Sequence, residues 1–338
     1  MVSATYDGAR PTMQDVAFEA GVSRALVSIV FRGAAGASEE TRERVFAAAD
    51  RLGYRTNRSA SLLASSRTRQ LGMVVDLHNS FHADLVDAAL VAADTAGYQI
   101  VLSPHTTTHD EKRAITTALE FRCEALLLVG PDLDAEALAR LTRGTPVVCV
   151  GRHLDLAHVD VVRSAEDRGM EQVVNHLVEL GHRRIAHIDG GSGEIAAARR
   201  AGFEQGLRRH RILSRAIILR GGRTEADGRR AGQELLRRLE LPTAVAAFND
   251  HCALGIIDTL SRSGLRIPED ISITGYDDSA LAQLTTIDLT SVRQDAAKLA
   301  TRAVKAAVER LEMRRTRRRE SVLNPQLVVR GSSASPHV

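Results

Sequence analysis

The chain has 338 residues, of which 44% are hydrophobic and 26% are charged, and this balance is ordinary for a globular protein of two or three domains. Its formal net charge is only +3. No apolar run approaches the roughly 18 residues that a membrane span needs, and the N-terminus is polar where a signal peptide would be apolar, so we expect neither a membrane protein nor a secreted one.

Three cysteines, Cys123, Cys149 and Cys252, lie far apart in the sequence, and no two have the spacing of a CxxC motif. Two of them stand inside apolar runs. An odd number of such cysteines predicts reduced and mostly buried thiols in a cytoplasm, without a disulfide framework and without a zinc site.

The whole positive excess lies near the N-terminus. Residues 1–70 hold ten arginines against seven acidic residues, whereas basic and acidic residues balance in the remainder. A local excess of arginine indicates a polyanionic partner for this segment, although a solvated helical face would carry the same charge.

A short helical pattern covers residues 13–20. Thr12 precedes it as an N-cap, and Asp15 stands three residues further on, as in a capping box. Gly21 then provides the backbone freedom that a tight turn needs.

A second helical pattern, at residues 24–30, begins after Ser23, and a third begins after Ser38 and ends at Gly53. Two short helices that are joined by a glycine turn and supported by a third helix are typical of the helix-turn-helix. Small three-helix bundles with no role on DNA share this geometry, so the spacing alone leaves both interpretations open.

Three stretches decide between them: MQDVAFEAGVS at residues 13–23, SEETRERV at residues 38–45 and LGY at residues 52–54. They resemble the start of the LacI/GalR family of bacterial transcription regulators, and the resemblance continues to residue 331. It implies an all-α helix-turn-helix headpiece, then a hinge helix, then a two-lobed α/β core that is similar to periplasmic binding proteins and has parallel sheets.

The resemblance also implies domain boundaries. The expected segments are a flexible arm at 1–10, the helix-turn-helix domain at 11–55, the hinge at 56–69, the effector-binding and dimerisation core at 70–331, and a disordered tail at 332–338. Three crossovers near residues 163, 291 and 321 would divide the core into a first lobe of 70–162 plus 292–320 and a second lobe of 163–291 plus 321–331.

By the same resemblance, the second helix lies in the major groove of DNA. Arg24 and Ala25 match the base-reading pair of the family, and Ser23 and Ser28 match hydroxyls that contact phosphate. Ile29 stands where the family commonly has an arginine; an isoleucine can touch a thymine methyl group but cannot donate to guanine. We therefore expect DNA binding at a sequence other than the usual operator.

Asn57, Ala60 and Leu63 match the family's hinge segment, which becomes a helix only on DNA. Leu63 would wedge into the minor groove, unstack a base step and bend the duplex. The alternative is a polar linker in which this leucine packs on the core. With Thr12 at the start of the first helix, these residues complete the expected DNA-binding set.

From residue 71 onward, near-continuous apolar runs alternate with amphipathic helical patterns, which predicts parallel sheets that are covered by helices on both faces. The candidate strands are residues 71–77, 99–103, 125–129, 147–150, 184–188, 216–219, 244–248, 271–275, 291–293 and 326–329. About 260 residues of this pattern fit two sheets better than one.

Ligands of such sheets bind beyond the carboxyl ends of the strands. By the resemblance, Arg199 is the arginine of an Arg-x-x-Gly motif, Asn249 opens an Asn-Asp motif, and Phe81 is an aromatic residue that packs on the ligand. The expected effector-binding residues are Asp76, His78, Phe81, Arg199, Arg223, Asn249 and Asp277. For each of them taken singly, a structural role such as a helix N-cap is an alternative.

Two positions depart from the family's pocket. Gly151 stands where many members have an aspartate, and Arg223 stands where many have an aromatic residue. One carboxylate fewer and one cation more, with Arg199 nearby, favour an anionic ligand, such as a sugar acid or a phosphorylated sugar.

We therefore expect a cytoplasmic, nucleoid-associated regulator, a homodimer or tetramer that acts as a repressor. Its partners would be double-stranded DNA with an approximately palindromic operator and a small effector, which either induces or co-represses. We expect no cofactor, no metal, no catalytic residues and no membrane partner.

Two alternatives stay open at this point. A solute-binding protein would share the core but lack the headpiece. A dinucleotide-dependent enzyme is suggested by a GxGxxA pattern at residues 191–196, but the next strand ends without the acidic residue that would bind ribose.

Overall fold

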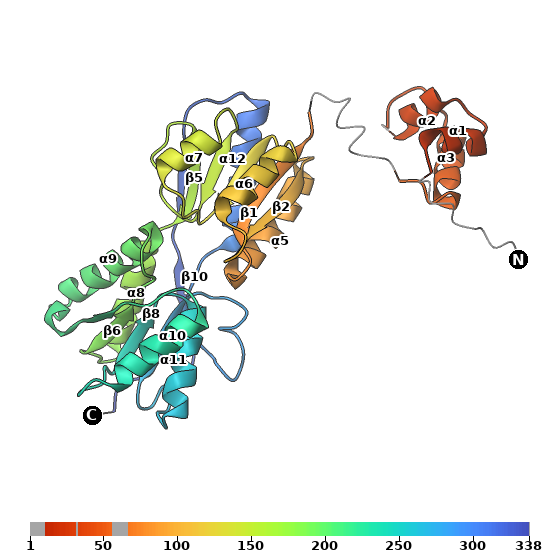
Figure 1. Ribbon diagram of the computed structural model, residues 1–338. Helices are drawn as coiled ribbons and strands as arrows, with labels where there is room; N and C mark the ends of the chain where they lie inside the picture. The colour runs from red at the N-terminus through yellow and green to blue at the C-terminus, as the bar shows by residue number, and fades with distance from the viewer. Residues whose placement is uncertain (1–10, 32, 56–66, 338) are drawn as a thin grey trace, which may run out of the picture. The chain divides into compact units, whose positions relative to one another are not determined.

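The computed structural model describes residues 11–31, 33–55 and 67–337. The chain divides into two compact units, residues 1–68 and 69–338, and each is described by itself (Figure 1). None of the helices in the described ranges is long and apolar enough to cross a membrane.

The first unit contains α1 (Met13–Ala20), α2 (Arg24–Phe31) and α3 (Glu39–Arg51). Thr12 and Asp15 form the expected capping box, and Gly21 adopts φ +65° at the turn between α1 and α2. Small apolar side chains from the three helices form one core, which consists of Val16, Ala17, Ala20, Val27, Val30, Val45, Ala48 and Ala49. The predicted three-helix headpiece is confirmed.

The second unit holds two sheets, each covered by helices on both faces (Figure 1). The first sheet has the strand order β11-β5-β4-β3-β1-β2, and all of its pairings are parallel. Its strands are β1 (Gln70–Asp76), β2 (Gln99–His105), β3 (Ala125–Val129), β4 (Val147–Val150), β5 (Val159–Ser164) and β11 (Glu320–Leu323).

Helices α5 (Ser80–Thr95) and α12 (Ala296–Glu312) pack on one face of this sheet. Helices α6 (Glu111–Glu120) and α7 (Ala135–Leu141) pack on the other. Strands β3 and β4 are buried along their whole length, as a parallel sheet between two helical layers requires.

The second sheet has the strand order β12-β10-β9-β8-β6-β7, in which only β12 runs antiparallel to its neighbour. Its strands are β6 (Ile185–Ile188), β7 (Ile217–Leu219), β8 (Ala244–Ala247), β9 (Ser272–Asp277), β10 (Thr290–Arg293) and β12 (Gln326–Val328). Helices α8 (Glu166–Glu179) and α9 (Glu194–Arg209) cover one face, and α10 (Glu225–Leu236) and α11 (Asp250–Arg262) cover the other. A short 3-10 helix, η1 (Leu213–Arg215), precedes β7.

The fold class is as predicted, but two strands, β5 and β11, were not among the candidate strands. They pair in parallel with each other at the edge of the first sheet. Because β11 reaches Leu323, the last crossover follows that residue, slightly later than the expected position near residue 321.

The expected disorder of the C-terminal tail is wrong for residues 332–337. The Ser332 hydroxyl accepts a hydrogen bond from the Thr290 N–H (2.8 Å) and donates one to the Ile273 carbonyl (2.6 Å). The Ala334 N–H donates to the Ser272 hydroxyl (3.0 Å). The tail is ordered because its backbone and serine hydroxyls satisfy polar groups of β9 and β10 that would otherwise be buried without partners.

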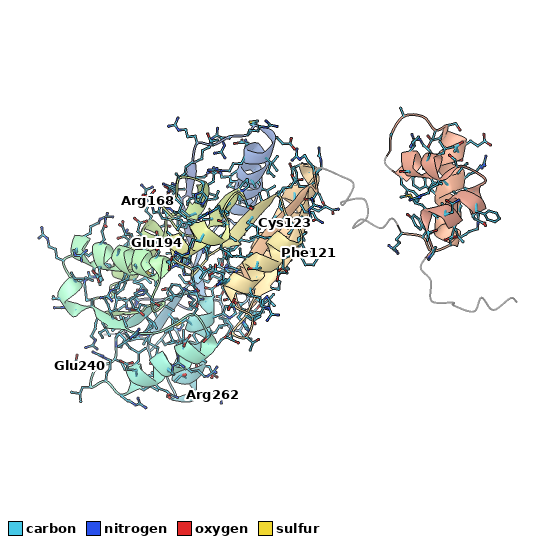
Figure 2. The ribbon with its side chains drawn as sticks, turned by 45° about the horizontal axis from the view of Figure 1, so that its top comes forward. Phe121, Cys123, Arg168, Glu194, Glu240 and Arg262 are labelled. Carbon is cyan, nitrogen blue, oxygen red and sulfur yellow. The ribbon has the colours of Figure 1, made fainter. Side chains whose placement is uncertain are left out.

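All three cysteines are buried and free, as predicted. Burial raises the pKa of the Cys123 thiol to about 11 and those of Cys149 and Cys252 to about 12. Figure 2 labels Cys123, which follows α6 just before β3. Thiols with such high pKa values are inert packing groups rather than nucleophiles.

Candidate functional site

The start of α2 presents the residues that were expected to read DNA. Ser23, Arg24 and Ala25 are exposed, and Ser28 and Ile29 are half-buried. The Ser23 hydroxyl caps the helix by accepting a hydrogen bond from the Leu26 N–H at 3.2 Å. This end of the helix therefore presents an exposed arginine side chain between two small exposed residues.

Most of the other headpiece arginines are used within the fold. Arg42 and Arg44 each donate a hydrogen bond to a backbone carbonyl, and Arg51 pairs with Glu19. Arg24, by contrast, forms no hydrogen bond or ion pair with the described residues. Part of the N-terminal charge excess is therefore structural, and Arg24 remains available to a partner.

Thr12 is exposed and engaged in the capping box of α1, so the structure assigns it a capping role beside the expected contact with DNA. The three hinge residues of the sequence prediction, Asn57, Ala60 and Leu63, lie outside the described residues.

The second unit contains a pocket at the carboxyl ends of strands from both sheets. All seven side chains of the expected effector set line it. The first lobe contributes Asp76, His78 and Phe81, and the second contributes Arg199, Arg223, Asn249 and Asp277.

Arg199 of α9 forms the floor of this pocket and is fully engaged. Its Nε donates to Glu166 (2.7 Å), its Nη1 to the Phe248 carbonyl (2.6 Å) and its Nη2 to Asp277 (3.3 Å). The guanidinium also lies 3.6 Å from the centre of the Tyr276 ring. The family's arginine is therefore a positioned hydrogen-bond donor here, and its charge is neutralised.

The two carboxylates that share this arginine are crowded. Burial raises the pKa of Glu166 and of Asp277, and Arg199 only partly opposes the shift. Burial, and then the charge of Asp277, raises the pKa of nearby Asp250 to about 7. The floor consequently holds more acidic groups than cations.

Other wall residues present defined donors and acceptors. The Nδ1 atom of buried His82 accepts a hydrogen bond from the Asp76 N–H (3.0 Å), and burial lowers the pKa of this imidazole to about 4. His82 is therefore neutral near pH 7, with its remaining proton on Nε2. The oxygen of Asn249 caps α11 and its amide nitrogen donates to the Arg223 carbonyl, so the capping alternative holds for Asn249.

The two cations behind the prediction of an anionic ligand both have carboxylate partners, and the charge of the ligand stays a prediction. Arg199 is occupied by two carboxylates, and Arg223 pairs with Asp132 of the first lobe at 2.9 and 3.2 Å. Gly151, where the family's aspartate is missing, adopts φ +97° and lies beside Gly130. Neither expected cation is left unpaired.

Several pocket residues were not predicted from the sequence: His82, His105, Gly130, Glu166, Ile195, Thr224, Phe248 and Gln294. His82, Thr224 and Phe248 stand next to predicted residues, and that proximity was the one available signal. In the sequence, Glu166 looks like an ordinary acidic residue in the first turn of a helix. Only the tertiary fold brings it into contact with Arg199.

The glycine pattern at residues 191–196 turns the chain. The Asp189 carboxylate accepts hydrogen bonds from the N–H groups of Gly191 and Gly221, and Gly191 and Gly193 both have positive φ. Among the described residues, no group of three histidine, cysteine or acidic side chains is arranged to hold a metal ion.

Comparisons with known proteins find matches to both units of the chain. The model of bacterial regulatory proteins of the lacI family matches residues 12–57, and that of the periplasmic binding protein-like domain matches residues 174–333. The transcriptional regulator AscG of Escherichia coli is 32% identical, with 83% of this chain and 86% of AscG covered. The transcriptional repressor PurR of Vibrio atlanticus is 30% identical, with 95% of this chain and 98% of PurR covered.

Solved structures give the same result. The Lac repressor dimer bound to operator and the anti-inducer ONPF is 29% identical, with a TM-score of 0.82 over 96% of this chain and 100% of that one. A LacI transcriptional regulator from a Rhodococcus species is 40% identical, with a TM-score of 0.77 over 79% of this chain and 100% of that one.

One unit is a helix-turn-helix, and the other has a pocket between two lobes. Together they define a ligand-responsive transcription regulator. The headpiece excludes a plain solute-binding protein, and the relatives are regulators rather than enzymes. The chain belongs to the LacI/GalR family of bacterial transcription regulators.

Proposed function

We propose that this regulator represses transcription as a homodimer on an approximately palindromic operator, and that a sugar or sugar derivative bound between its lobes sets its affinity for DNA. The observation that carries the proposal is the pocket whose walls come from both lobes and combine aromatic, amide, carboxylate and guanidinium groups. Such groups suit a small polyhydroxyl ligand.

On the DNA side, Arg24 is the base-reading residue, beside Ala25 and Ile29. Ser23 and Ser28 contact phosphate, Thr12 contacts the backbone from the start of α1, and Asn57, Ala60 and Leu63 contact the minor groove. Exposure of Ser23, Arg24 and Ala25 supports this assignment. An arginine fork can read two acceptors on one guanine edge, whereas Ile29 favours a thymine methyl group.

Effector and DNA are linked through the relative position of the lobes. A ligand that contacts both lobes stabilises one arrangement of them, and the dimer transmits that arrangement to the headpieces. By linkage, a ligand that changes operator affinity must itself bind differently to the free and the DNA-bound protein. The same scheme describes an inducer and a co-repressor.

Relatives support the assembly and the location. The Lac repressor was solved as a dimer on its operator, and a related regulator, CelR, was solved with cellobiose at a TM-score of 0.70 and 30% identity. A two-fold protein requires a two-fold site. We place the regulator in the cytoplasm, on the DNA of the nucleoid, because its operator is there.

Selection of operator sites from random double-stranded DNA, followed by fluorescence anisotropy at several salt concentrations, tests the proposal. The full chain should select a palindrome and bind it with a steep salt dependence. Arg24→Ala should weaken binding by about 5- to 100-fold and relax the preference at one base pair of each half-site. Arg51→Ala, whose arginine is paired on the headpiece surface, should leave that preference unchanged.

Two results would contradict the proposal. Removal of residues 1–66 should abolish specific binding, so retained specificity would place the DNA site elsewhere. A panel of sugars and sugar derivatives should include at least one that changes the affinity of the full chain for its selected site. If none did, the proposed regulatory role of the pocket would be wrong.

A further inference from the structure

The charges around the pocket do not balance. Three carboxylates line it, those of Asp76, Glu166 and Asp277, and the arginines that line it are Arg199 and Arg223. Arg199 is held by Glu166 and Asp277 together. The net charge that a ligand meets therefore depends on whether Arg223 is paired with a carboxylate.

Arg223 is held by Asp132 across the two lobes. Nη2 and Nη1 of the arginine donate to Oδ1 and Oδ2 of the aspartate at 2.9 and 3.2 Å, which is the paired geometry of a guanidinium and a carboxylate. Arg223 follows β7 in the second lobe, and Asp132 follows β3 in the first.

Both ends of this ion pair are fixed by further hydrogen bonds. The N–H groups of Asp132 and Leu133 donate to Glu111 Oε2 at 3.1 and 2.9 Å. On the other side, the Arg223 carbonyl accepts from the Asn249 amide at 3.0 Å. These hydrogen bonds fix the backbone at both ends of the pair, whose arginine and aspartate side chains are 39% and 61% exposed.

The carboxylates keep acceptor atoms for a ligand. Asp277 uses Oδ1 to accept from Arg199 and Gln294, and its second oxygen has no hydrogen-bond partner among the described residues. Glu166 uses Oε2 to accept from Arg199, and its side chain also has Tyr276 as a hydrogen-bond partner. Free acceptors suit the hydroxyl groups of a ligand, whereas a negatively charged ligand would meet carboxylates and no unpaired cation.

We propose that Asp132 sets the charge selectivity of the pocket: by occupying Arg223, it makes the pocket bind uncharged polyhydroxyl ligands and exclude anionic ones. This inference rests on the proposed function, because it presumes that the pocket holds the effector. It also predicts that loss of the Asp132 charge alone releases Arg223 and turns the pocket toward acidic ligands.

Asp132→Asn in the full chain is the direct test. The asparagine keeps the size of the side chain, and a second inter-lobe contact, from the Ser80 hydroxyl to His251 Nε2 at 2.9 Å, does not involve it. Glu136→Gln is the matched control, because it removes a carboxylate four residues away on the same lobe that has its own arginine partner, Arg140.

Isothermal titration calorimetry with D-glucose against D-glucuronate, and with D-galactose against D-galacturonate, measures the selectivity. The unaltered chain should prefer the neutral sugar of each pair. Asp132→Asn should shift the ratio toward the acid by about 3- to 10-fold, the effect of one unit charge near a partly exposed site. Glu136→Gln should not shift it, and Asp132→Asn combined with Arg223→Gln should restore the original ratio.

Sulfate is a second probe that does not depend on the choice of sugar. At constant ionic strength, replacing chloride by sulfate should raise the melting temperature of Asp132→Asn more than that of the unaltered chain, and Arg223→Gln should cancel the gain. Preference of the unaltered chain for the acids, or an Asp132→Asn variant that gains neither acid nor sulfate binding, would overturn the inference. A sulfate gain without binding of any sugar would keep the inference and count against a sugar effector.

Discussion

Two buried clusters of arginine and carboxylate side chains, one in each lobe, have opposite imbalances. In the first lobe, Asp160 of β5 accepts hydrogen bonds from Arg310, from Arg315 and from the Arg319 N–H. In the second lobe, Arg199 serves two acids.

The imbalance separates a structural cluster from a site. Burial opposes ionisation of Asp160, but the hydrogen bonds from Arg310 and Arg315 hold its pKa below the usual range. Burial raises the pKa values of Glu166 and Asp277 instead, and the second oxygen of Asp277 stays without a partner among the described residues. A cluster with surplus donors leaves no carboxylate oxygen for a ligand, whereas a cluster with surplus acceptors leaves one that can bind a ligand hydroxyl.

The largest expected effect comes from removing the cation of the second cluster. Arg199→Met leaves two buried carboxylates unpaired, and we expect a loss of about 3–5 kcal/mol in the free energy of unfolding. Arg315→Met leaves Asp160 its bidentate partner Arg310, so its cost should be about 1–2 kcal/mol. Urea denaturation at pH 7 measures both, and equal costs would break the comparison.

The dependence of the unfolding free energy on pH should also separate the two clusters. Asp250 lies beside the second cluster and is affected by the charge of Asp277. The folded pKa of Asp250, about 7, is above its usual value of 3.8, so its protonation stabilises the fold at low pH and this contribution is lost as pH rises toward 7. Between pH 5 and 7, the unfolding free energy of the unaltered chain relative to Asp250→Asn should fall by up to about 2.7 kcal/mol.

Asp160→Asn is the matched variant for this pH series. The pKa of Asp160 is lowered, so its carboxylate contributes stability above its unfolded pKa and loses it only as the pH falls through the folded value. The difference between the unaltered chain and Asp160→Asn should therefore stay constant from pH 5 to 7. A difference that followed pH in this range would contradict the assignment.

A smaller effect is expected at the neutral donor of the second cluster. Gln294 donates to Asp277 Oδ1 at 2.9 Å, and Gln294→Leu removes that bond while Arg199 still serves the carboxylate. The unfolding free energy should fall by about 1 kcal/mol in a denaturation series. A gain in stability would mean that this hydrogen bond contributes nothing.

The smallest effect is expected outside both clusters. Glu136 and Arg140 form an exposed pair one helical turn apart on α7. Glu136→Gln should change the unfolding free energy by less than about 0.5 kcal/mol, because solvent screens such pairs. A larger change would show that surface charge, rather than burial, governs the comparison.

The sequence predicted most of this fold because buried parallel strands leave apolar runs. It missed β5 because Asp160 interrupts the run Val159–Val162, and the arginines that make a buried aspartate acceptable lie about 150 residues further along the chain. It missed β11 because a short, half-exposed edge strand has no apolar signal.

The candidate pocket shows the same limit. Residue matches to the family placed seven side chains, and all of them line one pocket. The pairing of Arg223 with Asp132, and of Arg199 with Glu166, could not be predicted, because each joins segments far apart in sequence. The sequence therefore indicated which groups were present but not which charges remained free.

The position of the C-terminal segment has a consequence for synthesis of the protein. β11 pairs with β5 in the first sheet, β12 pairs with β10 in the second, and Ser332 joins β9 to β10. Neither lobe can complete its sheet until the segment that ends near Ala334 has left the ribosome. Each lobe therefore finishes folding only after its own part of this segment has been synthesised, while the headpiece, with its own local core, can fold long before.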